Sequence, residues 1–327
     1  MTEVFEQNFT ITQLREVDLL EAAKEDLKAG LKNKFALVPT LYFYDDLGSK
    51  IFRELCAEPS YYLPRAELRI LENYSSEISK KIGNRPIIEL GCGDCHKSAV
   101  LLNEMMIVHN ACQFIPVDVS LSVLEEAAKS LKTRIQGIQI SAVNGTYFDA
   151  FEHLYASASS PCAFVFLGST MAQFTDEMIA DFLSNTRKVA RRGDLFLVGF
   201  DLHKSAEILK APYNSASARN HQLNGPRHIN RLFDGNIDVD GIRSEAIWNE
   251  RKHRIEMTLK FTEKQNINLK KIKFKRCFQQ GETTLTHIMR KMTADEIVEI
   301  FRLNNMRSCE TWFDERNKFG VFLFEFN

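Results

Sequence analysis

The feature that most constrains the fold is a regular alternation of apolar runs and amphipathic stretches across residues 86–199. Short apolar runs predict buried strands, and apolar residues three and four positions apart predict helices. The expected strands are 86–90, 113–119, 138–143, 163–167 and 194–199, and the expected helices are 97–108, 121–135 and 175–190. Apolar strands that alternate with helices are typical of a parallel sheet covered on both faces. We therefore predict a doubly wound, mostly parallel α/β fold.

Length, composition and charge limit the class of protein. A chain of 327 residues suggests two domains at roughly 150 residues each, and 44% hydrophobic with 26% charged residues is ordinary globular composition. Forty-two basic against 43 acidic residues give a net charge of −1, so no global field attracts nucleic acid or an anionic membrane. No apolar run approaches the ~20 residues that span a bilayer. We expect neither nucleic acid nor membrane as a partner.

Cysteine usage and the N-terminus bear on the compartment. The seven cysteines are odd in number and scattered, which argues against a disulfide framework. The first residues, MTEVFEQNFT, lack a basic segment followed by an apolar core, so no secretory signal is visible. The sequence predicts a cytoplasmic protein.

The strand–helix alternation ends after residue 200. Residues 201–236 are polar and are expected to be loop-like and helical by turns, and three antiparallel strands are expected at 245–250, 254–261 and 272–277, before a turn at Gly281. A helix at 293–303 and two strands at 308–313 and 320–326 are expected to complete the sheet with an antiparallel edge. We predict one domain from residues 62–200 and 288–327, and a smaller α+β domain from residues 1–61 and 201–287.

A glycine-containing loop, E-L-G-C-G-D-C-H, follows the first expected strand at residues 89–96. Gly91 and Gly93 allow a tight turn and the close approach of a ligand at the carboxyl end of the strand. The G-x-G-x-x-G fingerprint needs a third glycine where this chain has His96, which disfavours a pyrophosphate site. Asp118 ends the second strand and could accept hydrogen bonds from two ribose hydroxyls. This combination resembles class I S-adenosylmethionine-dependent methyltransferases, with an NAD site or a structural turn as alternatives.

Other motifs favour simpler interpretations. Cys92 and Cys95 form a C-x-x-C at a helix start, but no second pair exists for zinc, and packing is favoured over a redox role. The histidines have no metal-ligand spacing and no G-x-S-x-G is present, so we expect neither a metal nor hydrolase chemistry. The basic segment 270–276, KKIKFKR, suggests RNA binding or a half-exposed strand, and the strand is favoured.

Three longer segments carry a more specific likeness: YFYDDLGSKIFRELCAEPSYYLPRAELRIL at 42–71, VFLGSTMAQF at 165–174 and DLHKSAEILKAPYN at 201–214. In this order around an E-L-G-C-G loop they resemble the histidine-specific N-alpha-methyltransferase family of ergothioneine biosynthesis. The likeness continues through 248–257, 281–286 and the last two strands. It implies a monomeric two-domain enzyme that methylates the amine of a small amino acid, with S-adenosylmethionine bound by the first domain and substrate by the second.

The resemblance also implies site residues. Those expected to line the cofactor are Tyr44, Gly91, Gly93, Lys97, Asp118, Gly145, Thr146, Tyr147, Gly168, Ser169 and Thr170. The family has Asp-Phe where this chain has Thr146-Tyr147, which puts the hydrogen bond to adenine in doubt. Tyr61 and Tyr213 match tyrosines that hold the substrate carboxylate, and with Tyr44 they are the expected catalytic residues. Met257 matches a substrate-pocket residue, although a core methionine is the alternative.

Three substrate positions depart from the family. Gln173 replaces an Asn that meets the substrate amine, and its extra methylene disturbs the alignment of the attacking nitrogen. His287 replaces a Glu that binds the imidazole, and Met289 replaces a Ser. Losing both hydrogen-bonding partners should abolish most preference for histidine.

The main hypothesis is an S-adenosylmethionine-dependent N-methyltransferase that acts on the α-amino group of a free amino acid other than histidine. An aromatic or an acidic side chain on that amino acid both remain open. The alternatives are a histidine N-alpha-methyltransferase and a catalytically silent module that binds the cofactor or an amino acid. Methyl transfer by in-line displacement requires neither a covalent nucleophile nor a metal.

Overall fold

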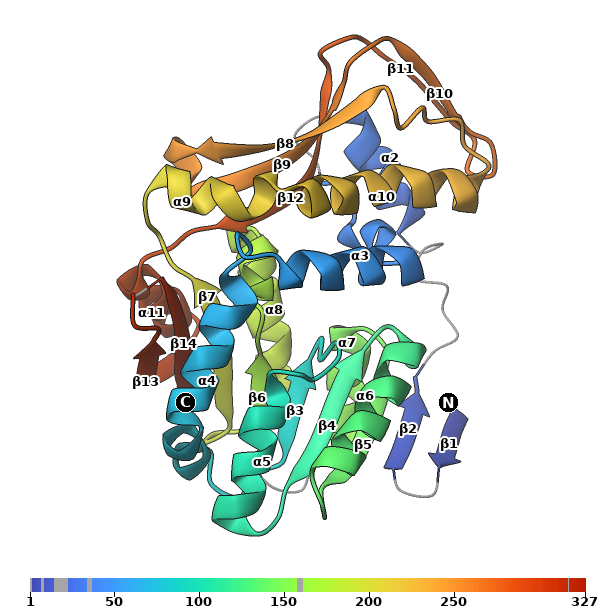
Figure 1. Ribbon diagram of the computed structural model, residues 1–327. Helices are drawn as coiled ribbons and strands as arrows, with labels where there is room; N and C mark the ends of the chain where they lie inside the picture. Colours follow the sequence, from blue (N-terminus) through green and yellow to red (C-terminus); the bar gives the residue numbers. More distant parts are fainter. Residues whose placement is uncertain (1, 7–8, 15–22, 34–36, 158–160, 317) are drawn as a thin grey trace. The chain divides into compact units, whose positions relative to one another are not determined.

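The computed structural model describes residues 2–6, 9–14, 23–33, 37–157, 161–316 and 318–327 (Figure 1). The chain divides into two compact units, and each is built from separate stretches of sequence. Unit 1 consists of residues 1–16, 63–202 and 292–327, and unit 2 of residues 17–62 and 203–291.

Unit 1 contains a nine-stranded sheet in the order β1-β2-β5-β4-β3-β6-β7-β14-β13. Its strands are β1 (Thr2–Glu6), β2 (Phe9–Gln13), β3 (Ile87–Leu90), β4 (Gln113–Asp118), β5 (Gln139–Asn144), β6 (Ala163–Phe166), β7 (Leu195–Asp201), β13 (Met306–Phe313) and β14 (Phe319–Phe326). Strands β2 to β7 pair in parallel, whereas β14 pairs antiparallel with β7 and with β13. The predicted doubly wound fold with an antiparallel C-terminal pair is confirmed.

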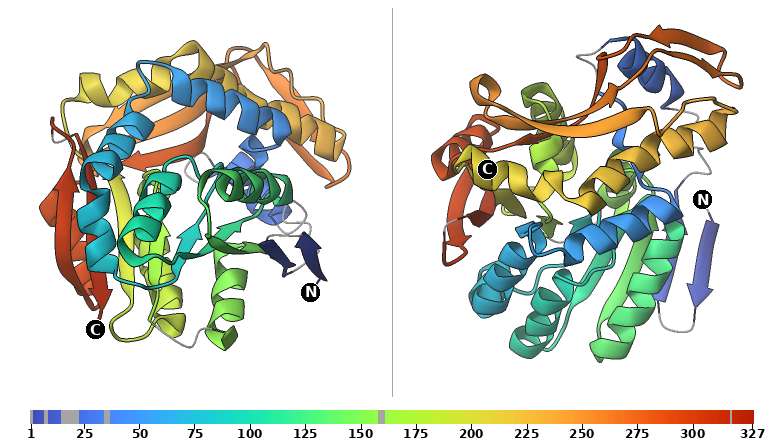
Figure 2. Two further views of the ribbon diagram at one scale, coloured as in Figure 1. Left: turned by 60° about the horizontal axis from the view of Figure 1, so that its bottom comes forward. Right: turned by 45° about the horizontal axis from the view of Figure 1, so that its top comes forward.

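Helices cover both faces of this sheet (Figures 1 and 2). They are α4 (Leu63–Ile82), α5 (Ser98–His109), α6 (Leu121–Arg134), α7 (Tyr147–Ser157), α8 (Asp176–Val189) and α11 (Ala294–Leu303). Because crossovers are right-handed and the strand order reverses at β3, the helices that follow β3 and β4 lie on one face and those that follow β5 and β6 on the other. Phe151, Phe182 and Phe301 bury α7, α8 and α11 in one phenylalanine-rich core.

The first two strands were not expected in this sheet. The sequence assigned residues 1–61 to the smaller domain, but β2 pairs in parallel with β5, and β1 extends the sheet beyond it. Phe9 and Ile11 are buried there. Strands of five residues with mixed polarity carry little signal of their own, because the sheet edge that they extend supplies their hydrogen bonds.

Unit 2 combines helices with two small antiparallel sheets of order β12-β9-β8 and β10-β11. Its elements are α2 (Lys24–Lys32), η1 (Thr40–Phe43), α3 (Asp46–Ala57), α9 (Ala206–Lys210), η3 (Ala211–Asn214), α10 (Ala216–Phe233), β8 (Ile242–Asn249), η4 (Glu250–Lys252), β9 (Arg254–Phe261), β10 (Gln265–Leu269), β11 (Phe274–Phe278) and β12 (Thr283–Arg290). The sequence pattern placed strands near β8, β9 and β11 but did not indicate β10 or β12.

Helix α10 is one continuous helix within the stretch at 201–236, which was expected to be loop-like and helical by turns. It begins after Ser215, whose side chain accepts a hydrogen bond from the backbone of Ala218, and it continues through Pro226. A Cβ atom at Gly225 would lie 2.3 Å from the ring of Phe43, so this glycine lets the helix pack closely against η1. Interior Gly and Pro disfavour helices locally, and here tertiary packing overrides that preference.

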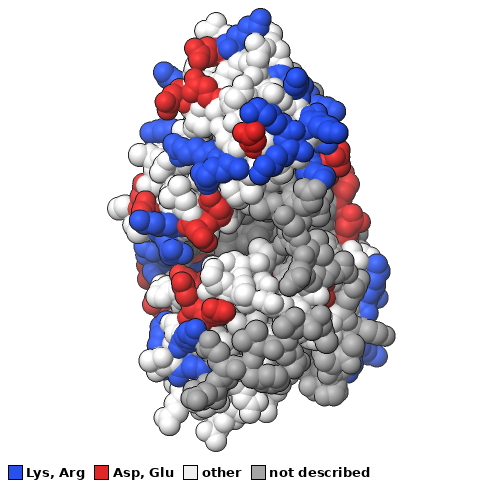
Figure 3. Space-filling model, turned by 90° about the vertical axis from the view of Figure 1, so that its right-hand side faces the viewer, with Lys and Arg blue, Asp and Glu red and all other residues white. Residues whose placement is uncertain are grey.

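The basic segment 270–276 begins with a turn and continues into β11. Ile272 and Phe274 are buried, whereas Lys271, Lys273 and Lys275 are exposed, which matches the half-exposed strand predicted for this segment. Lysine and arginine side chains gather in the upper part of the face shown in Figure 3.

Candidate active site

With the exception of Tyr44, the predicted cofactor residues lie on loops or at helix starts at one edge of unit 1. Strands β5, β4, β3 and β6 are neighbours and run parallel, so their carboxyl ends meet at the same edge. The four loops that leave these ends contain the Gly91–Gly93 turn, Asp118, residues 145–147 and residues 168–170. This is where open α/β sheets bind ligands.

The glycine loop packs directly against the neighbouring loops. Gly91 and Gly93 have φ angles of +67° and +55°, a region that favours glycine. The Gly93 N–H donates to Asp118 Oδ2 over 3.1 Å. A Cβ atom at position 91 would lie 2.8 Å from the hydroxyl of Tyr147, so only a bare backbone fits against this tyrosine.

Asp118 connects three of the loops. Its Oδ1 accepts from the Ser120 N–H over 3.0 Å, and its backbone oxygen accepts from the Gly145 N–H over 3.1 Å. Burial raises the pKa of the Asp118 carboxyl group. A carboxylate offers about four lone-pair sites, and the two backbone donors leave acceptor capacity for a diol. The residue therefore fits the ribose role expected for it.

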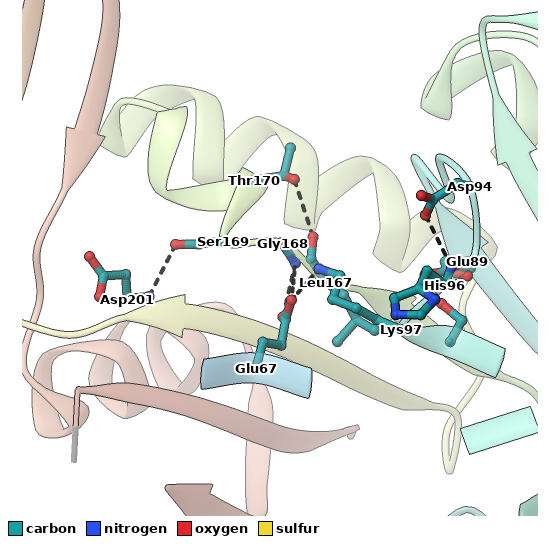
Figure 4. Close-up of polar contacts among 11 residues, drawn as sticks. Glu67, Glu89, Asp94, His96, Lys97, Leu167, Gly168, Ser169, Thr170 and Asp201 are labelled. Carbon is teal, nitrogen blue, oxygen red and sulfur yellow. Dashed lines mark hydrogen bonds and ion pairs between the residues drawn. The ribbon is translucent and has the colours of Figure 1, made fainter. Parts of the chain in front are cut away.

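A buried carboxylate that the sequence did not single out organises the loop after β6 (Figure 4). Glu67, on α4, is fully buried and forms an ion pair with Lys97. Both of its carboxylate oxygens accept from the Gly168 N–H at 2.9 Å. Its Oε1 also occupies the space that a side chain at Gly199 would need. Glu67 thus ties α4, the start of α5 and the Gly168 turn together.

The Gly168–Thr170 turn has an unusual backbone. Ser169 adopts a φ of +56°, which is uncommon for a residue other than glycine and often marks a functional site. Its Oγ accepts from the Asp201 N–H over 3.1 Å, and Thr170 Oγ1 donates to the Leu167 carbonyl over 3.2 Å. These bonds hold the turn against the end of β7 (Figure 4).

The resemblance predicts an aspartate at the position of Thr146, and the structure brings a carboxylate to the same turn. Asp149 Oδ2 accepts from the Thr146 hydroxyl over 2.7 Å and from its backbone N–H over 3.3 Å. A carboxylate acceptor is therefore present three residues later in the chain, at a position that the motif comparison did not indicate.

The cysteines of the glycine loop are buried thiols. A hydrogen bond with Cys95 and burial raise the pKa of Cys92 well above its ordinary value, which is the opposite of a reactive cysteine. This supports packing over a redox role. The described part of the chain contains no group of three or more His, Cys, Asp or Glu side chains placed to hold a metal ion.

Glu89, at the end of β3, is a second unpredicted group beside the loop. Burial raises its pKa to about 8, and Ser98 donates to its Oε1. Its Oε2 is buried and has no hydrogen-bond partner among the described residues. An unpaired buried carboxyl oxygen next to a glycine turn suits a polar ligand group.

The predicted tyrosines of unit 2 belong to one aromatic cluster. Tyr44 packs edge-on against Phe52 with ring centroids 5.5 Å apart, Phe52 against Tyr61 at 6.3 Å, and Tyr61 against Tyr213 at 6.1 Å. His221, on α10, lies 4.9 Å from the Tyr44 ring. Tyr61 and Tyr213 are buried, and Tyr44 is 39% exposed. The sequence assigned Tyr44 both a cofactor-binding role and a catalytic role with Tyr61 and Tyr213, and it lies in the unit that carries these two tyrosines.

His287 is buried in the same unit and is held by a polar network. Its Nδ1 lies 3.2 Å from Gln222 Nε2, and the Thr286 hydroxyl lies 2.6 Å from Gln222 Oε1. Its ring packs edge-on against Phe43 at 4.8 Å, and Met257 is its partner across β9 and β12. Burial lowers the pKa of His287 to about 3. The side chain is therefore neutral at pH 7.

The remaining predicted substrate residues lie on two different units. Met289 pairs with Ile255 at the end of β12 and is half-buried. Gln173 ends the short helix η2 (Thr170–Gln173) of unit 1 and is also half-buried. The residues that the sequence did not single out are Glu67, Glu89, Asp149, His221, Gln222 and Lys291, although Glu67 and Glu89 lie inside the motif segments 42–71 and 89–96.

Comparison with known proteins identifies the family. The sequence profile described as "Histidine-specific methyltransferase, SAM-dependent" matches residues 23–326. The chain belongs to this family. It is 32% identical over 305 residues to the histidine N-alpha-methyltransferase of Mycobacterium tuberculosis (strain CDC 1551 / Oshkosh), covering 92% of this chain and 94% of that protein.

Two further relatives widen the comparison. The histidine N-alpha-methyltransferase of Mycolicibacterium smegmatis (strain ATCC 700084 / mc(2)155) is 32% identical over 306 residues, covering 93% of this chain and 94% of that protein. The L-tryptophan methyltransferase of Psilocybe serbica is 27% identical over 310 residues, covering 86% of each chain. The chain is thus an S-adenosylmethionine-dependent N-methyltransferase, and the predicted family, enzyme class and cofactor are confirmed.

The residues of unit 1 fit this cofactor. Three features suit a polar nucleoside ligand: the bare turn at Gly91 and Gly93, the acceptor capacity of Asp118 and the unpaired Oε2 of Glu89.

Among the residues that the structure describes, no helix combines the length and the apolar character needed to cross a bilayer.

Proposed function

We propose that the protein methylates the α-amino group of a free amino acid other than histidine. The observation that carries this proposal is the state of His287, which stands where the family has a carboxylate for the imidazole of histidine. Burial keeps His287 neutral, and Gln222 occupies its Nδ1. A neutral imidazole cannot supply the charge-assisted hydrogen bond that a carboxylate gives an imidazole N–H.

The side chain of the acceptor can be narrowed further. His287 Nε2 is buried and has no hydrogen-bond partner among the described residues. An unpaired buried polar atom costs about 1–3 kcal/mol, and a polar atom of the acceptor would remove that cost. We therefore expect an acceptor whose side chain ends in a hydrogen-bonding group. A relative named for L-tryptophan supports acceptors other than histidine within the family.

The chain's own residues would position the two reactants. The cofactor supplies a methyl group on a sulfonium, and the loops of unit 1 hold it through Asp118, Lys97 and the Gly168 turn. Tyr61 and Tyr213 would hold the acceptor carboxylate without placing a strong cation at the reacting centre. Orientation of a neutral amine behind the methyl carbon, with water excluded by the aromatic cluster, is the main contribution expected from the protein.

An acceptor screen tests this function. The purified protein would be incubated with S-adenosylmethionine and each proteinogenic amino acid, and mass spectrometry would follow the methylated product and S-adenosylhomocysteine. We expect a non-histidine amino acid to give the highest kcat/KM. If histidine were the best acceptor, the histidine N-alpha-methyltransferase suggested by the two mycobacterial relatives would be correct instead.

Restoring the family residues provides a matched test. The double variant His287→Glu/Met289→Ser should raise kcat/KM for histidine by about ten- to a hundredfold, since it returns a charged partner and a hydroxyl to the pocket. His253→Glu makes the same histidine substitution at an exposed position and should leave histidine turnover unchanged. An unchanged preference in the double variant would remove His287 and Met289 from the acceptor site.

A further inference from the structure

A buried lysine lies against one of the carboxylate-binding tyrosines. Lys291 follows the last residue of β12 and has no solvent-exposed surface. Its backbone N–H donates to the His253 carbonyl over 2.8 Å, which anchors it to the neighbouring strand end. Its Nζ donates to the Tyr213 hydroxyl oxygen over 3.1 Å and lies 5.2 Å from the centre of the Tyr213 ring.

We propose that Lys291 is a positioning residue that makes Tyr213 selective for a free α-carboxylate on the acceptor. The enzyme would then accept amino acids and reject the corresponding decarboxylated amines and carboxamides. This inference rests on the proposed function, because it concerns the same acceptor, but it holds for any side chain on that acceptor.

The reason is the polarity of the hydrogen bond. An ammonium that donates to a phenol oxygen draws electron density from it, which makes the phenol O–H a stronger donor. A stronger donor gains most with an anionic acceptor, since charge-assisted hydrogen bonds are about twice as strong as neutral ones. Lys291 thus strengthens the hydrogen bond that the Tyr213 hydroxyl donates, while its own Nζ stays hydrogen-bonded to the oxygen of that hydroxyl.

The surroundings favour an anion over a neutral group. Tyr213 is 4% exposed, and the ring of Tyr61 packs edge-on against it at an interplanar angle of 87°. In such a dehydrated setting the field of a nearby ammonium is screened far less than at the surface. A carboxylate therefore gains more from Lys291 than a carboxamide does, and a hydrogen atom at the same position gains nothing.

The same unit contains a second lysine–tyrosine pair that serves as a control. Lys204 Nζ donates to the Tyr62 hydroxyl over 2.9 Å and lies 5.2 Å from the ring centre. Lys204 and Tyr62 are only half-buried, and neither belongs to the proposed acceptor site. Lys204→Met therefore removes a pair of nearly the same geometry from another place in the fold.

The test compares matched acceptors: tryptophan with tryptamine and tryptophanamide, histidine with histamine and histidinamide, and tyrosine with tyramine and tyrosinamide. For wild type, Lys291→Met, Lys291→Arg and Lys204→Met, kcat/KM is measured for each set. We expect wild type to prefer the amino acid. Lys291→Met should reduce that preference by about ten- to a hundredfold, the effect of one hydrogen bond to a charged group. Lys291→Arg should retain most of it, and Lys204→Met all of it.

The ratio of kcat/KM for the amino acid to kcat/KM for its amine or amide distinguishes a loss of carboxylate recognition from a general structural defect. A structural defect in Lys291→Met would lower turnover of amino acid, amine and amide together, and an unchanged ratio would overturn the inference while leaving the proposed function intact. Wild-type turnover of amines or amides as efficient as that of the amino acids would also overturn it. Failure of wild type to methylate any amino acid would overturn the proposed function and this inference together.

Discussion

At the scale of single residues, buried charged groups rather than exposed ones organise the site. Glu67 satisfies the Gly168 N–H and the Lys97 ammonium simultaneously, and it is fully enclosed. Lys291 plays a comparable part beneath Tyr213. Buried ionic groups of this kind add little to stability when intact, but the removal of one partner leaves the other uncompensated.

Glu67→Gln should therefore weaken cofactor binding. The amide keeps one acceptor for Gly168 but no charge for Lys97, so we expect about tenfold weaker binding of S-adenosylhomocysteine by calorimetry. The free energy of unfolding should fall by less than the roughly 3–5 kcal/mol seen for fully buried pairs, because the Lys97 side chain is 24% exposed.

Glu325→Gln is the matched control for this variant. Its ion pair with Arg307 lies at the surface, where such pairs contribute about 0–1 kcal/mol. Cofactor binding should be unchanged in this control. Cofactor affinity as high in Glu67→Gln as in wild type would mean that the Gly168 turn does not depend on Glu67.

At the scale of elements, helix α10 links the aromatic cluster to the His287 network. Its first turn follows directly after Tyr213, and it carries both His221 and Gln222. The geometry of the proposed acceptor site therefore depends on where this helix begins. The Ser215 side chain sets that start by accepting from the Ala218 N–H over 3.0 Å.

Ser215→Ala should lower the free energy of unfolding by about 1 kcal/mol, the usual cost of losing an N-cap. It should also raise the KM for the acceptor, because fraying of the first turn moves the segment that follows Tyr213. Thr293→Ala removes the capping box of α11 in unit 1 and provides the control. A similar loss of stability there, with unchanged acceptor KM, is expected, and an equal KM increase in both variants would contradict the link.

At the scale of the whole molecule, two buried histidines make the free energy of unfolding depend on pH. Burial lowers the pKa of His221 to about 4 and that of His287 to about 3, from an ordinary value of 6.5. Between pH 6.5 and about 4 the unfolded chain binds more protons than the folded one. Stability therefore falls as the pH falls, by up to about 1.4 kcal/mol per pH unit for each histidine.

His287→Gln should make this pH dependence shallower. Urea unfolding would be measured at pH 7, 6 and 5 in a Trp312→Phe background, which leaves Trp248 of unit 2 as the only tryptophan. Glu89, with its pKa raised to about 8, changes stability in the opposite direction between pH 4.5 and 8, so the comparison is made between variants. Equal slopes for His287→Gln and its parent would refute the burial effect.

The fold of unit 1 was predictable because its central strands are buried on both faces. All five apolar runs coincide closely with β3, β4, β5, β6 and β7, and parallel topology then places their carboxyl ends together. Strands β1 and β2 were not predictable from local pattern, and neither was the extent of helix α10. The two strands depend on an existing sheet edge, and the helix contains Gly225 and Pro226, which only packing within unit 2 makes acceptable.

The sequence by itself determined the family and the cofactor class and predicted positions at which this chain departs from histidine methyltransferases, because these are properties of residue identity and order. The tertiary structure alone decided that His287 is neutral, that Lys291 lies beneath Tyr213, that Glu67 holds the Gly168 turn and that Asp149 brings a carboxylate to Thr146. Burial and hydrogen bonding between residues far apart in the chain set these properties, and neither can be read from local spacing.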